Sequence, residues 1–213
     1  ARLGQPRLRG VSHAYASVAA IAVAVTVVAL APAGLPRAAA IVFGAGLCAP
    51  FAGSGLYHRW RWDVRWRPLL QRIDHSTIFV FIAASYTPIA LLVLHGTTQA
   101  AVLIGVWAGA IAGVLLSVLW IGAPRWLTAA TYLSLGWAAL LAVPQLISGL
   151  PLWPLLLLGL GGLLYSASAV IYATQRPNPW PATFGFHEVF HVLVIAAAAA
   201  HAAAMAGWVL PAG

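Results

Sequence analysis

The chain has 213 residues, of which 62% are hydrophobic and only 7% are charged. Soluble domains carry about 25% charged residues, so this composition excludes a soluble protein and indicates one that crosses a membrane several times. Eleven arginines against three acids give a net charge of +8, but orientation in a bilayer explains them better than nucleic-acid binding, for which no fold signal is present.

Seven apolar segments follow one another, each about as long as a helix needs to cross a hydrocarbon core of about 30 Å. Their continuity predicts an all-α bundle of seven transmembrane helices in one domain over residues 1–213, because a barrel would show short alternating strands. The expected spans are about 14–31, 38–58, 73–94, 98–121, 126–147, 152–173 and 184–208. The first resembles a signal peptide, but Pro32 directly after the cleavage-like Ala29-Leu30-Ala31 argues for a retained helix.

The arginines are distributed unevenly between the two ends of these spans. With the N-terminus in the cytoplasm, ten of the eleven lie on the cytoplasmic side and only Arg37 lies on the other. Basic loops stay in the cytoplasm, so we expect the N-terminus inside and the C-terminus outside.

Two further patterns concern helix packing. Glycines repeat at four-residue spacing on the fourth span, at Gly105, Gly109 and Gly113. Such a stripe indicates close helix contact within the bundle, although a dimer face is possible as well. Three prolines lie inside spans, at Pro50, Pro88 and Pro144. They predict kinks, which in membrane bundles often open a polar cavity.

His187 and His191 open the last span with four-residue spacing, which puts both imidazoles on one face of a helix. Two histidines so placed often hold a metal ion, and ionisable groups inside a membrane segment are costly enough to indicate function. A histidine pair that bonds to neighbouring helices is the alternative.

The predicted topology brings other polar residues to the same membrane depth. Ser54 and His58 close the second span and Asp74 opens the third, so all three share the inner leaflet with His187 and His191. Three neutral imidazoles with an open fourth position make a catalytic type of zinc site. His58, His187 and His191 are therefore the candidate ligands of Zn²⁺.

Asp74 and Ser54 are the candidate catalytic residues beside that metal. Zinc lowers the pKa of bound water from about 15.7 to about 7, and a carboxylate such as Asp74 can act as the general base. The Ser54 hydroxyl could bond a ligand histidine or the zinc-bound water. The alternatives are an ion pair between Asp74 and Arg72, and a bond from Ser54 back to a helix carbonyl.

The last span also matches the H-E-x-x-H pattern of zinc proteases, in which the glutamate is the base. We favour this less, because Glu188 points about 100° away from the face that carries His187 and His191. We expect Glu188 to pair with an arginine at the interface.

The four remaining histidines are weaker candidates. His75 follows Asp74 and faces elsewhere, although it is a rival ligand. We expect His13 to be interfacial and His95 to lie at the outer side. His201 is near the face of His187 but about 20 Å along the helix, where it lines the cavity or bonds within the bundle.

Together these residues resemble the hemolysin III family, the bacterial branch of the progestin and adipoQ receptor superfamily. Three motifs carry the resemblance, in the order and spacing of the family and over nearly the whole chain: Ser54-Gly-Leu-Tyr-His58, Asp74-His75-Ser76 running to Tyr86-Thr87-Pro88, and His187-Glu-Val-Phe-His191. The resemblance implies zinc held by His58, His187 and His191, with Asp74 reaching it through a water and Ser54 behind the ligands.

The resemblance also implies kinship with adiponectin receptors and alkaline ceramidases. We therefore expect a zinc-dependent intramembrane hydrolase of a lipid amide or ester in the plasma membrane of a bacterium, with an acyl chain lying between the helices. The alternative is a non-enzymatic sensor or regulator of membrane state, in which zinc only links the second span to the seventh. A cytolysin is less favoured, because the spans show no run of charged pore-lining residues. The oligomeric state is open.

Overall fold

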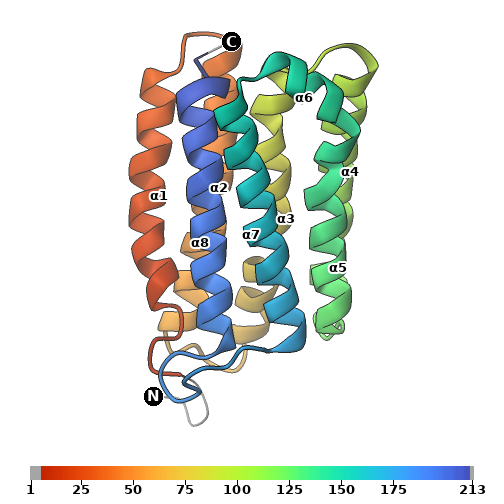
Figure 1. Cartoon of the computed structure of the whole chain (residues 1–213). Coiled ribbons are helices and arrows are strands. Elements are labelled where there is room, and N and C mark those ends of the chain that lie inside the picture. The colour runs from red at the N-terminus through yellow and green to blue at the C-terminus, as the bar shows by residue number, and fades with distance from the viewer. Residues whose placement is uncertain (1–5, 212–213) are drawn as a thin grey trace.

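A computed structural model describes residues 6–211 and shows an all-helical bundle (Figure 1). In chain order its elements are α1 (Val11–Leu30), α2 (Leu35–Arg59), α3 (Arg67–Leu92), α4 (Gly96–Leu119), α5 (Arg125–Gly136), a 3₁₀ segment η1 (Trp137–Ala142), α6 (Val143–Gly149), α7 (Leu152–Thr174), α8 (Phe186–Ala204) and a π-helical turn η2 (Met205–Val209). Among the described residues, strand-like pairing is limited to one bridge between Trp180 and Phe184.

Seven spans are long and apolar enough to cross a membrane, which confirms the predicted fold class. Most of their ends agree with the expected ranges to within about three residues. The third span begins six residues earlier than expected, at Arg67. Hydropathy marks only the apolar part of a helix, whereas Pro68 in the first turn lets α3 start within the polar segment before it.

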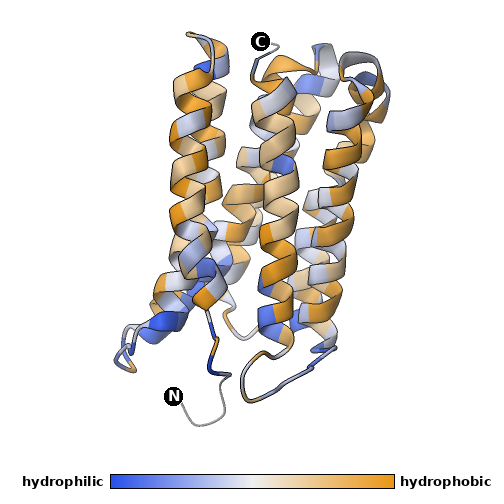
Figure 2. Ribbon diagram, turned by 60° about the vertical axis from the view of Figure 1, so that its left-hand side comes forward, coloured by the Kyte–Doolittle hydropathy of each residue, from blue (hydrophilic) through white to orange (hydrophobic). Residues whose placement is uncertain are grey.

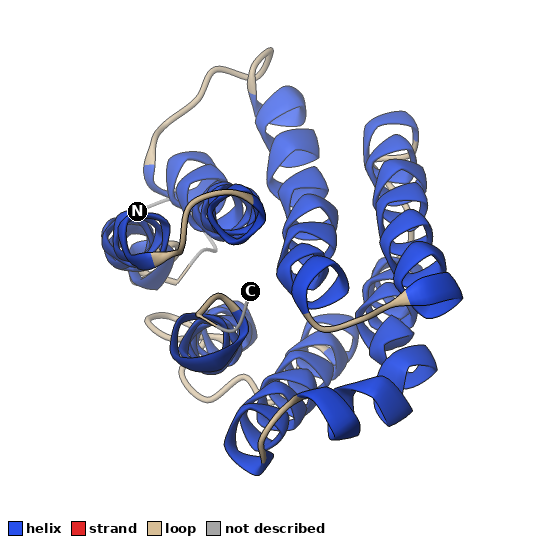
Figure 3. Cartoon of the chain, turned by 90° about the horizontal axis from the view of Figure 1, so that it is seen from above, coloured by secondary structure: helices blue, strands red, loops and turns tan. Residues whose placement is uncertain are grey.

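Helices that follow one another in the chain pack side by side, and α8 returns to lie between α1 and α7 (Figures 1 and 3). The last span therefore closes the bundle onto the first. Hydrophilic residues gather at the end of the bundle where α1 begins (Figure 2). At the opposite end, Arg37 donates two hydrogen bonds to the Ala31 carbonyl.

The fifth span is broken near its middle. The α-helix ends at Gly136, six residues of 3₁₀ helix follow, and α6 completes the crossing. Tyr86 of α3 holds the break, because its hydroxyl donates to the Gly136 carbonyl and accepts the Ala139 N–H. Pro144 lies in the first turn of α6, where a missing N–H costs no helix bond, so the break precedes the proline that was expected to cause it.

Two glycines of the fourth span make the predicted close contacts. A side chain at Gly113 would collide with the Phe79 ring of α3, and one at Gly109 would collide with Leu135 of α5. At Gly105 a Cβ would meet no atom within 4 Å. The stripe thus serves packing inside the bundle at two of its three positions.

Candidate metal centre

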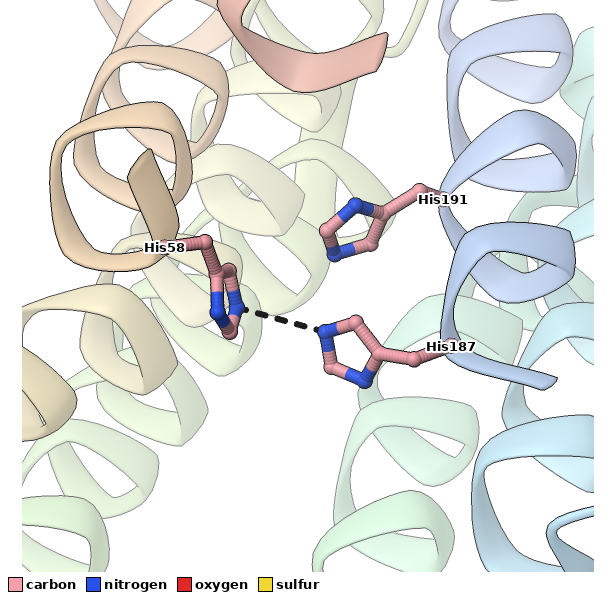
Figure 4. A group of neighbouring side chains, drawn as sticks. All are labelled: His58, His187 and His191. Carbon is pink, nitrogen blue, oxygen red and sulfur yellow. Dashed lines mark hydrogen bonds between the residues drawn. The ribbon is translucent and has the colours of Figure 1, made fainter. Parts of the chain in front are cut away.

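Three histidines from two helices converge near the end of the bundle where α1 begins. His58 lies in the last turn of α2, and His187 and His191 lie in the first two turns of α8. Their candidate ligand nitrogens all lie within 4.8 Å of one another, and the Nε2 atoms of His58 and His187 are 3.2 Å apart. Figure 4 shows the three rings facing a common point between the helices. Together they could hold a metal ion.

The donor set fits zinc. Ligand nitrogens at zinc–nitrogen distances of about 2.0–2.1 Å in a tetrahedral site are about 3.3 Å apart, which is the spacing already present between His58 and His187. Imidazole also suits copper, iron and nickel, so the rings alone do not select the metal. The Nδ1 atom of His191 is buried without a hydrogen-bond partner among residues 6–211, as a nitrogen available to a ligand would be.

Asp74 lies within reach of this group. Its Oδ2 atom is 3.7 Å from His58 Nε2, and its side chain lines a small chamber together with Ser54, His187 and His191. The alternative partner, Arg72, instead donates its Nε–H to the Val118 carbonyl of α4 at 2.9 Å. The carboxylate therefore faces the histidines.

The Ser54 hydroxyl differs from most hydroxyls in the bundle. Ser85 and Thr87, for example, bond back to carbonyls of their own helix, as small hydroxyl residues in membrane helices commonly do. Ser54 Oγ is buried close to the Asp74 carboxylate, and it makes no hydrogen bond of ordinary length and angle within the described part of the chain. Its donor and acceptor sites are therefore available to a polar group in the chamber.

Glu188 pairs with an arginine, as expected, but at a buried position. Its Oε1 atom lies 3.5 Å from Arg9 Nη1, and its Oε2 atom accepts the Gly185 N–H at the start of α8 at 2.8 Å. Burial lowers the pKa of the Arg9 guanidinium, while the Glu188 charge opposes that shift. Both carboxylate oxygens are thus engaged, which disfavours Glu188 as the base of an H-E-x-x-H protease.

Arg9 belongs to a segment, Pro6–Gly10, that we call the N-terminal strap. Its backbone N–H groups at Arg7 and Leu8 donate to the carbonyls of Ala182 and Thr183, at 3.0 and 3.1 Å. The strap thereby joins the first helix to the loop before α8.

The strap ends against the metal centre itself. Gly10 has a φ of 72°, a conformation that favours glycine, and a Cβ there would lie 2.5 Å from the Cβ of His58. The backbone of Gly10 therefore packs directly on the residue that contributes the first histidine of the group.

The expectation that His13 is interfacial is wrong. Its side chain is buried, and its ring stacks on His191 with 3.6 Å between ring centroids and 10° between planes. It also lines the chamber that holds Ser54 and Asp74. The sequence placed His13 at the correct depth, but depth does not show which way a residue at the end of a helix faces.

The other histidines are divided among three places. His75 lines the chamber, so it does not face away from Asp74, but it is not part of the candidate ligand group. His95 is exposed at the opposite end of the bundle, as expected. His201 meets both of its expectations, because it lines an apolar cavity and its Nε2 lies 3.3 Å from the Leu158 carbonyl.

That apolar cavity lies next to the chamber, between the helices of the bundle. Together with space that is open to the surroundings, it measures about 860 Å³. It shares part of its wall with the chamber, through Pro50, Ile78, Tyr132, Tyr172, Phe190 and Val194. Farther along it is lined by Phe81, Tyr165 and His201. The chamber at the metal centre and an apolar cavity between the helices therefore adjoin one another.

A family model described as haemolysin-III related matches residues 2–202. The chain belongs to the haemolysin-III related family. With its seven spans and its bacterial relatives, this member is a multi-pass protein of a bacterial plasma membrane.

The family member is similar to two Bacillus proteins and to a mammalian one. It is 31% identical over 159 residues to the "Hemolysin-3 homolog" of Bacillus subtilis, a match that covers 75% of this chain and 71% of the relative. It is 30% identical over 141 residues to the "Hemolysin-3" of Bacillus cereus, covering 65% and 61%. It is 26% identical over 197 residues to the human "Monocyte to macrophage differentiation factor", covering 89% and 78%. The resemblance drawn from the three motifs is therefore confirmed.

Proposed function

We propose that this haemolysin-III protein is a zinc-dependent hydrolase that cleaves a lipid amide or ester within the membrane. One observation carries the proposal: Ser54 and Asp74, from α2 and α3, line the same chamber as two of the three clustered histidines. A structural metal site needs only its ligands and their supports, whereas hydrolysis needs a carboxylate beside the position of the water.

The residues of the chamber divide the chemistry between them. A zinc ion held by the three histidines would lower the pKa of a water molecule and polarise the carbonyl of the substrate. Asp74, 3.7 Å from His58, would take the proton from that water. The buried hydroxyl of Ser54, which lies close to Asp74, would orient the water by a hydrogen bond.

The cavity beyond the chamber supports a lipid as the substrate. Most of the accessible surface of its wall is apolar, and the wall runs from Pro50 near the metal centre to His201 deep in the bundle. An acyl chain in this space would place its polar linkage in the chamber. Binding energy from the distant part of the chain would then hold the reacting carbonyl in place.

The orientation of the bundle decides which leaflet supplies the substrate. The metal centre lies at the same end as the N-terminal strap, where most of the hydrophilic residues gather (Figure 2). Because basic segments remain in the cytoplasm, we propose that this end is cytoplasmic and that the substrate enters from the inner leaflet.

A non-enzymatic role is the second candidate, and the arrangement of the ligands favours it in one respect. His58 comes from α2, whereas His187 and His191 come from α8, so a metal ion would join two spans that are far apart in the sequence. In that function, as a sensor or regulator of membrane state, the metal would cross-link α2 to α8 and Asp74 would have no catalytic role.

Asp74→Asn separates the two functions. Elemental analysis of detergent-purified protein should find about one zinc ion per chain in the wild type and in Asp74→Asn, and much less in His191→Ala. Release of fatty acid from long-chain lipid amides and esters should fall at least about 100-fold in Asp74→Asn, because general bases contribute about 10²–10⁴ in rate. Asp63→Asn, a change at an exposed carboxylate in the loop before α3, is the control and should behave as the wild type.

Two results would contradict the proposal. Unchanged turnover in Asp74→Asn would remove Asp74 from the mechanism. If the zinc-loaded wild type releases no fatty acid from any of these lipids, the non-enzymatic role with a structural metal site would remain as the function.

A further inference from the structure

His13 is a fourth histidine of the chamber, contributed by α1. Its ring is only 4% exposed and is held between the face of His191 and the edge of Phe51, whose ring centroid lies 5.1 Å away. Both of its ring nitrogens are buried, and neither makes a hydrogen bond of ordinary length and angle among residues 6–211, although the backbone of His191 lies close to the ring.

These two nitrogens are unfavourable for stability as they stand. A buried polar atom without a partner costs free energy that an apolar ring of the same shape would not, so phenylalanine would fill this place better. Buried polar groups in native proteins are usually satisfied, so an exception at a candidate site calls for a partner there, such as a ligand, an ion or a bound water. The histidine is therefore explained by something that binds in the chamber.

The metal ion is not that ligand. The candidate ligand group consists of His58, His187 and His191, and His13 is not part of it. The parallel stack puts the His13 ring against the face of His191 rather than in line with its nitrogens. His13 thus lies beside the metal centre, in the wall of the chamber that would receive the polar linkage of a lipid.

We propose that His13 positions the substrate by accepting a hydrogen bond from the amide N–H of a lipid amide, and that it thereby selects amides over esters. This inference rests on the proposed function for its substrate class. A neutral imidazole has one acceptor nitrogen and one donor nitrogen. The acceptor suits an amide N–H, which an ester of the same length does not have, and the donor suits a hydroxyl of the head group.

Selection of this kind follows from the burial of His13. A site built to bond a polar hydrogen of its substrate discriminates against the analogue without it, because the protein group is then left unpaired. The amide should therefore bind at least about tenfold more tightly than its ester analogue.

The test uses two probes that differ by one group, N-(2-hydroxyethyl)oleamide and 2-hydroxyethyl oleate. Their affinities are measured by competition with a fluorescent fatty acid, in full-length zinc-loaded protein that carries Asp74→Asn to suppress turnover. We expect the amide to bind about tenfold more tightly than the ester, and His13→Phe to abolish this preference. His13→Phe should keep its zinc, because its ring can still stack on His191.

Two further variants control the result. His13→Gln keeps an acceptor and a donor without the ring, so it should retain part of the preference for the amide and serves if His13→Phe does not fold. His95→Phe replaces an exposed histidine at the opposite end of the bundle and should bind both probes as the parent does.

Equal binding of the two probes by the parent, or an amide preference that survives His13→Phe, would overturn this role for His13. Binding of neither probe would overturn both this role and the proposed function. If the amide preference depends on His13 but the protein with Asp74 intact releases no fatty acid, the role in binding stands and the hydrolase is wrong.

Discussion

Arg9→Met should destabilise the protein because it leaves the Glu188 carboxylate without its ion-pair partner. The Glu188 side chain is 2% exposed, whereas that of Arg9 is 19% exposed. The carboxylate therefore cannot turn to water when its partner is removed. The guanidinium, at the edge of the bundle, can do so when Glu188 is replaced instead.

The magnitude follows from this asymmetry. Removing one partner of a buried ion pair costs about 3–5 kcal/mol, and the contact of 3.5 Å and the partial exposure of Arg9 favour the lower end of that range. A loss of about 3 kcal/mol lowers the melting temperature of a chain of this size by about 6–12 °C. Glu188→Gln keeps an acceptor for the Gly185 N–H, and the Arg9 guanidinium that it leaves unpaired is partly exposed. This substitution should therefore lower the stability by only about 1 kcal/mol.

Thermal unfolding of the purified variants in one detergent measures these differences. Arg9→Met combined with Glu188→Gln should recover most of the loss, because neither charge is then left unpaired. Arg7→Met changes an exposed arginine of the same strap and should shift the melting temperature by less than about 2 °C. If Glu188→Gln costs more than Arg9→Met, or Arg9→Met behaves as Arg7→Met does, the reasoning from burial is wrong.

Three further changes test other parts of the structure. Gly10→Ala should weaken zinc binding, because the new Cβ would displace His58; the measurement is the zinc content after dialysis against a chelator. The control is Gly34→Ala, because Gly34 also has a positive φ but a Cβ there would meet no described atom within 4 Å, so zinc should stay bound. His191→Ala should lose both bound zinc and thermal stability, because ligand binding contributes to the folded state; full zinc occupancy would contradict the ligand assignment. Tyr86→Phe removes the two hydrogen bonds at the break in the fifth span, so thermal unfolding should show a loss of stability of about 1–2 kcal/mol. No change in stability would mean that side-chain packing alone maintains the break.

Much of the candidate site could be read from the sequence, because two simple periodicities determined it. Helical spacing put His187 and His191 on one face, and alternation of the spans brought Ser54, His58 and Asp74 to their depth. Both inferences need only the length and direction of each helix. The structure brings these residues together, with the three ligand candidates within 4.8 Å of one another.

The missed features depend on how a helix is rotated about its axis. The first span is apolar on nearly every face, so no pattern indicated that His13 turns inward to stack on His191. The partner of Glu188 could not be named either, because Arg9 reaches it only through the path of the strap, far away in the sequence.

The sequence by itself determined the seven spans, the family and the depth of the polar residues, because hydropathy and helix geometry act locally along the chain. Only the tertiary structure decided which faces meet: that Glu188 is engaged by Arg9, that Ser54 lies beside Asp74, and that His13 belongs to the chamber. In a membrane helix of uniformly apolar residues, rotation is fixed by packing against neighbouring helices, and that information is not contained in any single segment.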